Sequence, residues 1–197
     1  TRADHSKAGQ SIARVLSNRV GVGNSRFRLG TEQPVAVDTI PFGIYPRSVF
    51  DQAGYYDERL IRNQDIEFSK RLTRRVGRLY LVPSVICYYH FKGHYGLLSR
   101  SNLNNGLWNV LTVSMTGKLG SVSLRHLVPL MLVLFLFASL LLGFMADPVF
   151  LLILVFAGVG YLLLLVATAL RINNHHTSVP AIIWAFIVLH LSYGLGS

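Results

Sequence analysis

Residues 63–72, with the sequence NQDIEFSKRL, contain the side chains best placed to do acid–base chemistry in this chain. The pattern predicts a helix whose first turn carries Asp65 and Glu67. Backbone N–H groups and the helix dipole stabilise a carboxylate at that position and keep it ionised, as a general base near neutral pH must be. Asp65 is therefore a candidate base, and Glu67 could bind an acceptor hydroxyl. The alternatives are an ordinary N-cap for Asp65 and charge complementarity with the helix dipole for Glu67.

Two further groups of side chains could bind a phosphate or a metal, and each has an ordinary structural alternative. Arg26 and Arg28 follow the glycine-rich residues 21–24 and could contact a pyrophosphate. That stretch lacks the third glycine and the preceding apolar strand of a nucleotide fingerprint, so a plain loop with solvated arginines stays open. His90 and His94 have the spacing of two metal ligands on a helix, but they come at an expected strand end, where such side chains diverge. His90 is a candidate metal ligand, with a partly buried or interfacial histidine as the alternative.

The elements that would position these side chains follow from apolar periodicity and from the placement of glycine and proline. In chain order the pattern predicts a helix at about 11–17, a strand at 34–42 that carries Asp38, a helix at 48–53, the helix that begins near Asp65 and ends at Gly77, and strands at 78–82 and 84–91. Residues 97–115 predict an amphipathic helix with Trp108. This helix could lie at headgroup level on a membrane or pack only on its own domain.

The charge of the chain is confined to its first part. The 197 residues are 51% hydrophobic and carry a formal net charge of +10, and 18 of the 19 basic and 8 of the 9 acidic residues precede residue 127. This composition excludes a disordered chain, and a single cysteine excludes a disulfide scaffold. A basic polar half joined to a neutral apolar half is typical of a domain anchored to a membrane with anionic lipids. No nucleic-acid partner is expected, because the sequence has no Lys-rich run and no zinc-finger spacing.

Three apolar segments are long enough, or nearly so, to cross the roughly 30 Å hydrocarbon core of a bilayer as helices. They cover residues 127–146, 149–170 and 179–195. The third is shorter and more polar, so it is either a span or a helix lying against the others. Basic residues that flank spans stay cytoplasmic, and here they include Arg125 and Arg171. This pattern predicts a multi-pass protein of the inner or plasma membrane with its polar N-terminal half in the cytoplasm.

The order of these pieces resembles a known family. The chain has VDTIPFGIYPRSVFDQAGYYDERLIRNQDIEFSKRL, then GRLYLVP, and then SLRHLVP leading into the apolar segments. It resembles the family 2 glycosyltransferases of the GT-A fold, and within them the exopolysaccharide branch typified by succinoglycan biosynthesis. The resemblance covers roughly residues 21–81 and 124–129, and the final HLSYGLG segment matches how that branch continues.

Carried over by position, the resemblance implies roles for individual residues. Asp65 stands where the family has its catalytic base, and Gln64 replaces the acid that precedes the base in the family motif. That replacement removes one charge that could tune the pKa of Asp65. The residues implied in binding the acceptor and its sugar are Phe42, Gly43, Ile44, Asp57, Glu58, Gln64 and Glu67.

The resemblance also implies a reaction. It is the inverting transfer of a sugar from a nucleotide-diphosphate donor to a lipid-linked or polysaccharide acceptor in surface or exopolysaccharide biosynthesis. In this family a divalent metal, Mg or Mn, stabilises the departing diphosphate through an Asp-x-Asp motif, which does not occur in this sequence. The donor half and the main metal ligands are therefore expected outside this chain, which begins at Thr1 without an initiating Met.

The predicted fold class is α/β, the acceptor-side half of a GT-A domain, followed by an all-α transmembrane bundle of two to three helices. Residues 1–96 would form the end of the transferase domain, 97–126 an amphipathic interfacial segment, and 127–197 the membrane anchor. The expected partners are a nucleotide-sugar donor, a lipid-linked glycan acceptor and an anionic membrane. The competing hypothesis is a non-catalytic membrane scaffold or regulatory subunit of a polysaccharide assembly complex, which needs no donor site.

Overall fold

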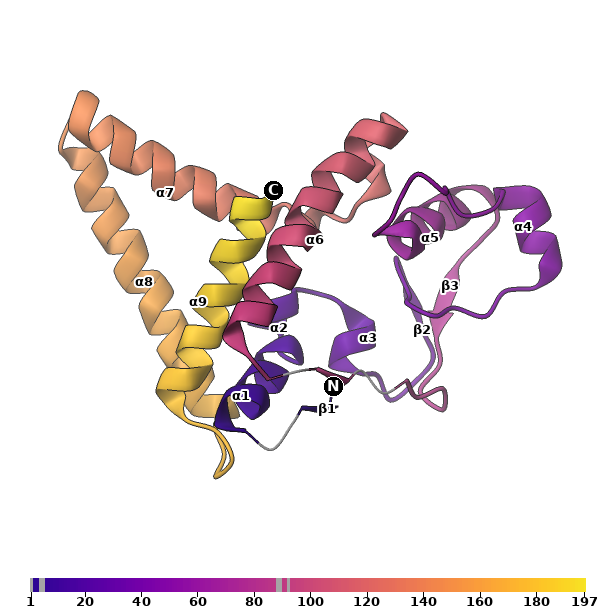
Figure 1. Ribbon diagram of the computed structural model, residues 1–197, viewed down its shortest axis with the longest axis horizontal. Helices are drawn as coiled ribbons and strands as arrows, with labels where there is room; N and C mark the ends of the chain where they lie inside the picture. Colours follow the sequence, from indigo (N-terminus) through magenta and orange to yellow (C-terminus); the bar gives the residue numbers. More distant parts are fainter. Residues whose placement is uncertain (1, 4–5, 88–89, 92) are drawn as a thin grey trace.

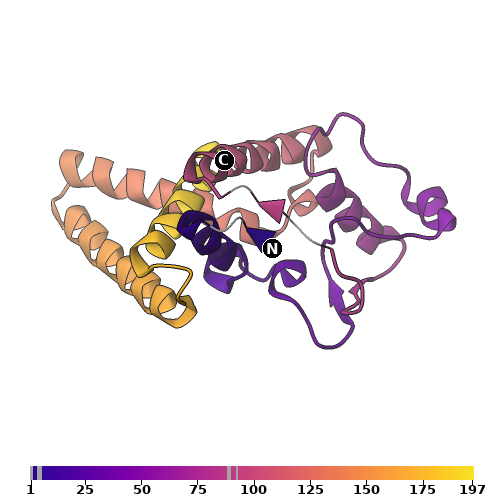
Figure 2. The ribbon, with the colours of Figure 1, turned by 60° about the horizontal axis from the view of Figure 1, so that its bottom comes forward.

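The computed structural model describes residues 6–87 and 93–197, together with the backbone of residues 2–3 and 90–91. Its elements, in chain order, are β1 (Arg2–Ala3), α1 (Lys7–Leu16), α2 (Arg19–Val22), α3 (Arg26–Leu29), β2 (Val35–Val37), α4 (Arg47–Ala53), α5 (Gln64–Arg75), β3 (Leu79–Leu81), β4 (His90–Phe91), α6 (Tyr95–Thr116), the 3-10 turns η1 (Leu119–Ser121) and η2 (Leu124–His126), α7 (Val128–Met145), α8 (Val149–Ile172) and α9 (Val179–Gly196). The molecule is mostly helical. Figure 1 and Figure 2 both place α4 and α5 at one end, α7 and α8 at the other, and α1, α6 and α9 between them.

The α/β half expected from the sequence does not form a layered sheet among the described residues. Their strands make two separate two-stranded sheets, with β2 antiparallel to β3 and β1 parallel to β4. The strand expected at 34–42 ends at Val37, because Pro41 has no N–H to donate and Phe42 adopts a φ of 55°, outside the extended region. Of the strand expected at 84–91, residues 84–87 are not a strand, residues 90–91 form β4, and residues 88–89 lie outside the described residues. The all-helical character expected for the second half of the chain is present.

The polar end of the molecule is built around α5. Its inward face places Phe68 and Leu72 against Ala53 of α4 and Leu79 of β3, all of them buried. Four more aromatic rings pack around or beside Phe68, at Tyr45, Phe50, Tyr55 and Tyr56. This small core holds the N-terminal turn of α5, and therefore Asp65, in a fixed position.

The second core joins the polar half to the apolar helices. It contains buried residues of α1, α6, α8 and α9, among them Ile12, Leu98, Leu165 and Phe186. The helices α7, α8 and α9 are each long and apolar enough to cross a membrane, so the chain is a membrane protein. In Figure 1, α7 and α8 diverge from the turn that joins them, and α9 runs between their other ends. Because α9 also packs on α1 and α6, it is the most buried of the three.

A hydrogen-bonded histidine fixes this arrangement. The Nε2 of His190 on α9 lies 2.9 Å from the carbonyl oxygen of Val20, and its Nδ1 lies 2.8 Å from the hydroxyl of Tyr161 on α8. A carbonyl oxygen only accepts, so Nε2 carries the proton and Nδ1 accepts from the tyrosine. His190 therefore satisfies both of its ring nitrogens while it ties α8 and α9 to the polar half.

The helix α6 confirms that residues 97–115 are helical, and its buried positions are mostly small or polar. Its buried positions include Asn102, Gly106 and Asn109, whereas Leu103 and Leu107 are exposed. Small and polar residues on the inner face let α6 approach α9 closely. The apolar side chains left outside continue toward the first membrane helix and are suited to contact with lipid.

Replacing Gly106 with Ala should separate α6 from α9. A Cβ at Gly106 would lie less than 3.0 Å from backbone atoms of Tyr193, Gly196 and Ser197, so the helices must move apart. Overpacking of this kind costs about 1–3 kcal/mol, and the apparent Tm of the protein in detergent should fall by several degrees. Gly158→Ala in α8 is the matched control, since a Cβ there meets nothing within 4 Å. An unchanged Tm for Gly106→Ala would contradict the close packing of α6 on α9.

Candidate functional site

Asp65 is the second residue of α5 and not its N-cap. The helix begins at Gln64, and the cap position is taken by Asn63, which adopts a left-handed conformation with φ of 63°. Asparagine tolerates that conformation better than most residues. The Asp65 carboxylate accepts a hydrogen bond from the neighbouring Ile66 N–H at 2.9 Å. Asp65 is therefore not the N-cap residue, but its carboxylate binds a free N–H group of the first helical turn, while Asn63 makes no side-chain cap hydrogen bond.

The surroundings of Asp65 suit a base. The side chain is partly buried, and burial raises the pKa of its carboxyl above the usual value for aspartate. The pKa of Tyr56 is also raised, mainly by burial and next by the charge of Asp65. The pKa of Tyr45 is raised mainly by burial, and the charges of Tyr56 and Asp65 raise it further. These three groups therefore lie close enough to sense one another's charge.

Aromatic packing sets the two tyrosines beside Asp65. The ring of Tyr56 lies 4.6 Å from that of Phe68, and the ring of Tyr45 lies 5.2 Å from it, measured between centroids. Phe68 is completely buried one turn along α5 from Asp65. Tyr45 and Tyr56 were not singled out from the sequence. They lie in the segments GIYP and GYYDE, and the glycine and proline residues of these segments predicted only turns.

A polar relay ties the segment before Asp65 to the helices α6 and α9. The amide of Asn63 donates to Oδ1 of Asn109 at 2.9 Å, and Nδ2 of Asn109 donates to the hydroxyl of Tyr193 at 2.6 Å. The Arg62 guanidinium similarly donates to Asn105 at 3.0 Å. The position of Asp65 therefore depends on helices far away in the sequence.

The predicted acceptor residues fall into two groups in space. Phe42 and Ile44 are 81% and 90% exposed on the loop between β2 and α4, with Gly43 packed under the ring of Tyr45. This loop leads directly to the tyrosine beside Asp65. Gln64 donates from its amide to the Ile61 carbonyl at 3.1 Å.

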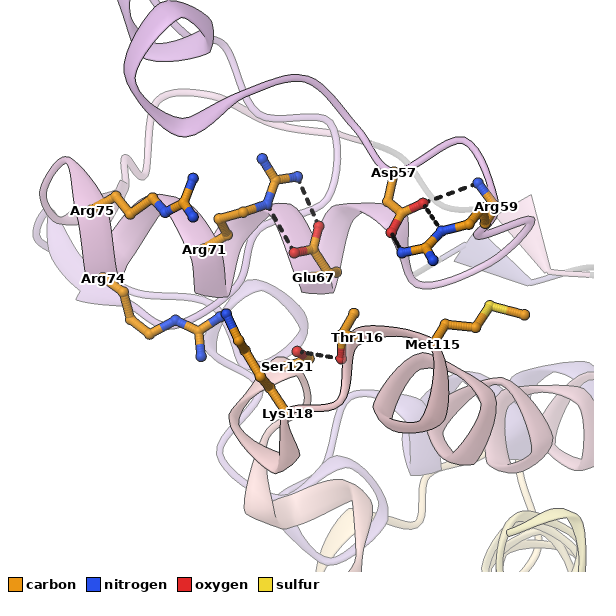
Figure 3. A pocket seen from close by; sticks show the side chains of 10 residues that line it. All are labelled: Asp57, Arg59, Glu67, Arg71, Arg74, Arg75, Met115, Thr116, Lys118 and Ser121. Atoms are coloured by element: carbon orange, nitrogen blue, oxygen red, sulfur yellow. Dashed lines mark hydrogen bonds and ion pairs between the residues drawn. The ribbon is translucent and has the colours of Figure 1, made fainter.

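Two of the other predicted acceptor residues, Asp57 and Glu67, line a cleft on another side of α5. Asp57 pairs with Arg59 at 2.6 Å, and the buried Glu67 pairs with Arg71 at 2.8 Å (Figure 3). Two residues along a helix correspond to about 200°, so Glu67 points away from Asp65. Glu58 is exposed. Hydrogen bonding by Arg59 lowers the pKa of Asp57 to about 2, which keeps that carboxylate ionised. The acceptor roles of these three acids stay predictions.

The weaker phosphate and metal candidates lie far from Asp65 in the chain. Arg26, with Arg19, lines a small hollow of about 270 Å³ near Gly23, while the Arg28 guanidinium lies 5.5 Å from the ring centroid of Phe27. The side chain of His90 lies outside the described residues. Among those described, no three His, Cys, Asp or Glu side chains gather as a metal site would require.

A charged network that the sequence did not reveal joins the polar half to the first membrane helix. Both carboxylate oxygens of Asp38 accept from Arg125 at 2.9–3.0 Å, and Lys70 lies 3.0 Å away. Ser123 also donates to Asp38. Burial alone would raise the pKa of Asp38, but the hydrogen bonds from Ser123 and Lys70 and the charge of Arg125 hold it well below its usual range. The network fixes β2 and α5 to η2.

Comparison with protein-family models, with curated proteins and with solved structures found no match for this chain. The resemblance to family 2 glycosyltransferases therefore stays a prediction.

Proposed function

We propose that this chain is the acceptor-side part of a membrane-bound inverting glycosyltransferase, in which Asp65 is the general base. The observation that carries the proposal is the partly buried Asp65 in the first turn of α5, whose carboxylate accepts from the Ile66 N–H and whose pKa burial raises toward the working range of a base. The tyrosines beside it and the exposed loop at residues 42–44 supply an apolar, aromatic surface of the kind on which a sugar ring can lie.

The chemistry assigned to this chain is a proton transfer. An acceptor hydroxyl placed next to Asp65 gives its proton to the carboxylate while its oxygen forms a bond to the anomeric carbon of the donor sugar. The bond from that carbon to the nucleotide diphosphate breaks, and the diphosphate leaves with the electron pair. A divalent metal is expected in the intact enzyme, but the described side chains do not form a site for it, so no step is assigned to it.

Sugar transfer by the intact protein tests this function. Membranes that contain the protein should move label from a radioactive nucleotide-sugar into the lipid-extractable fraction. The transfer should depend on Asp65 and persist when Asp51, an exposed aspartate on α4, is changed to Asn. Label that never reaches lipid or polysaccharide, with any common nucleotide-sugar, would favour the scaffold hypothesis instead.

The proposal places the polar half in the cytoplasm, and Cys87 tests that orientation. Cys87 is the single cysteine of this chain and it is exposed. A membrane-impermeant maleimide should label it in inverted vesicles and not in sealed vesicles of native orientation, where detergent should be needed. Cys87→Ser is the control that removes the label. Labelling from the outer side of intact membranes would reverse the orientation and separate Asp65 from cytoplasmic nucleotide-sugars.

A further inference from the structure

A cleft of about 520 Å³ lies on the opposite side of α5 from Asp65. Its walls are α5, the loop that follows α4, and the segment that connects α6 to η1 (Figure 3). We name it the basic cleft for its lining side chains, which are Asp57, Arg59, Glu67, Arg71, Arg74, Arg75, Met115, Thr116, Lys118 and Ser121.

The charge of the basic cleft is not balanced by the protein. Five of its side chains are cationic and two are anionic, and both acids are already paired, with Arg59 and with Arg71. In the part of the chain that the structure describes, no carboxylate lies within 4.0 Å of Arg74, Arg75 or Lys118. Cations gathered in one cleft repel one another and focus a positive potential that attracts an anion.

The cations come from separate segments, which distinguishes the cleft from an ordinary helix end. Arg74 and Arg75 are in the last turn of α5, where the helix dipole alone would favour them. Lys118 comes from a different element, since it follows the C-terminal end of α6, and it lines the same cleft as Arg74. The Arg74 guanidinium also lies against Gly120 of η1. Arginine presents several N–H groups in a planar fork that matches the oxygens of a phosphate.

The cleft is next to the membrane part of the chain. Met115 forms part of its wall, and Leu119, one residue after Lys118, is 76% exposed. Leu124, which is also exposed, begins the first membrane segment. A group bound in the cleft would therefore have a positive surface for its head, and the exposed Leu119 and Leu124 lie close by along the chain for an apolar tail.

We propose that the basic cleft binds the phosphate or diphosphate group of a membrane lipid. The binding itself does not depend on the proposed sugar transfer. If that function is correct, the natural occupant is the phosphate-bearing head of the lipid-linked acceptor, and this last step rests on the proposed function.

Binding to the full chain in neutral detergent tests the proposal. Calorimetric titrations would use a short-chain phosphatidic acid, the corresponding phosphatidylcholine, and inorganic pyrophosphate. Arg74→Gln with Lys118→Gln removes two charges from the cleft. Arg78→Gln with Arg100→Gln is the matched control, since both of these arginines are exposed and neither lines the cleft.

We expect phosphatidic acid to bind, pyrophosphate to compete with it, and phosphatidylcholine not to bind. The cleft variant should weaken the binding of phosphatidic acid at least about tenfold, as expected for the loss of charge-assisted hydrogen bonds. The control variant should weaken that binding about twofold or less. Equal weakening by both variants would show that net charge alone attracts the lipid and would overturn the proposal. If pyrophosphate binds and phosphatidic acid does not, the phosphate group in the cleft does not come from a lipid, and the proposal is overturned. Phosphatidic acid binding without any sugar transfer would refute only the proposed function.

Discussion

Sugar transfer should fall by about two to four orders of magnitude when Asp65 is replaced by Asn, the range that general-base catalysis contributes. Asn keeps the size of the side chain and can accept the hydrogen bond from Ile66, but it cannot take a proton. The initial rate of label transfer, per amount of protein in the membrane, is the measurement. Asp51→Asn is the matched control and should keep the wild-type rate.

The fold should tolerate this change, and that separates catalysis from structure. Because burial raises the pKa of Asp65, the folded state favours the neutral carboxyl, and the ionised form costs stability at neutral pH. A neutral Asn removes that cost, so the apparent Tm of Asp65→Asn should equal or exceed that of the wild type. A variant that loses both activity and stability would assign Asp65 a structural role.

The same pKa shift predicts the acid side of the pH profile. The base works only when ionised, so kcat/KM should decline as the pH is lowered through the raised pKa of Asp65. That decline should be centred above the value of about 3.9 that an unperturbed aspartate shows. A decline centred at or below that value would contradict burial as the dominant influence on this carboxyl.

Replacing Glu67 with Gln should produce the largest loss of stability among single substitutions at the predicted site. The Glu67 and Arg71 side chains are only 7% and 16% exposed and form two hydrogen bonds of 2.8–2.9 Å. Arg71 also donates to the carbonyl oxygens of Ala53 and Tyr55, so this pair holds the loop after α4 onto α5. Removing one charge of a buried ion pair costs up to about 3–5 kcal/mol, and the loss here should be at the lower end because Arg71 keeps its bonds to the two carbonyl oxygens.

The apparent Tm in detergent measures this effect, and Glu58→Gln is the control. Glu58 is an exposed acid of the same predicted acceptor set, and its replacement should change stability by no more than about 0.5 kcal/mol. The acceptor KM of Glu67→Gln should not rise at temperatures where the variant is folded, because the change removes a negative charge from the basic cleft. A raised KM with unchanged stability would instead support the direct acceptor role that the family resemblance implies for Glu67.

The local features of this protein were predictable from its sequence. The start of α5 just before Asp65, the short helix α4 and the three apolar helices follow from periodicity, helix caps and hydrophobic length, which act within a few turns of chain. The confinement of the net charge to the first part of the chain is likewise a property of composition.

The predictions failed where the outcome depended on partners elsewhere in the chain. Residues 84–87 have strand-like side chains but do not form a strand, since a strand needs a neighbour to accept its hydrogen bonds. The sequence left open whether α6 lies at headgroup level or packs on its own domain, and its contact with α9 through Gly106 and Asn109 depends on residues far away in the chain.

The tertiary structure also decided what the charged residues do. Asp38 and Arg125 are 87 residues apart and form the junction to the membrane, while Glu67, two residues from Asp65, turns to an ion pair on the other side of the helix. The sequence by itself determined which segments become helices and where Asp65 lies on one of them. Only the fold determined its tyrosine neighbours and the basic cleft, because electrostatic and packing energies depend on distances between side chains that chain order does not specify.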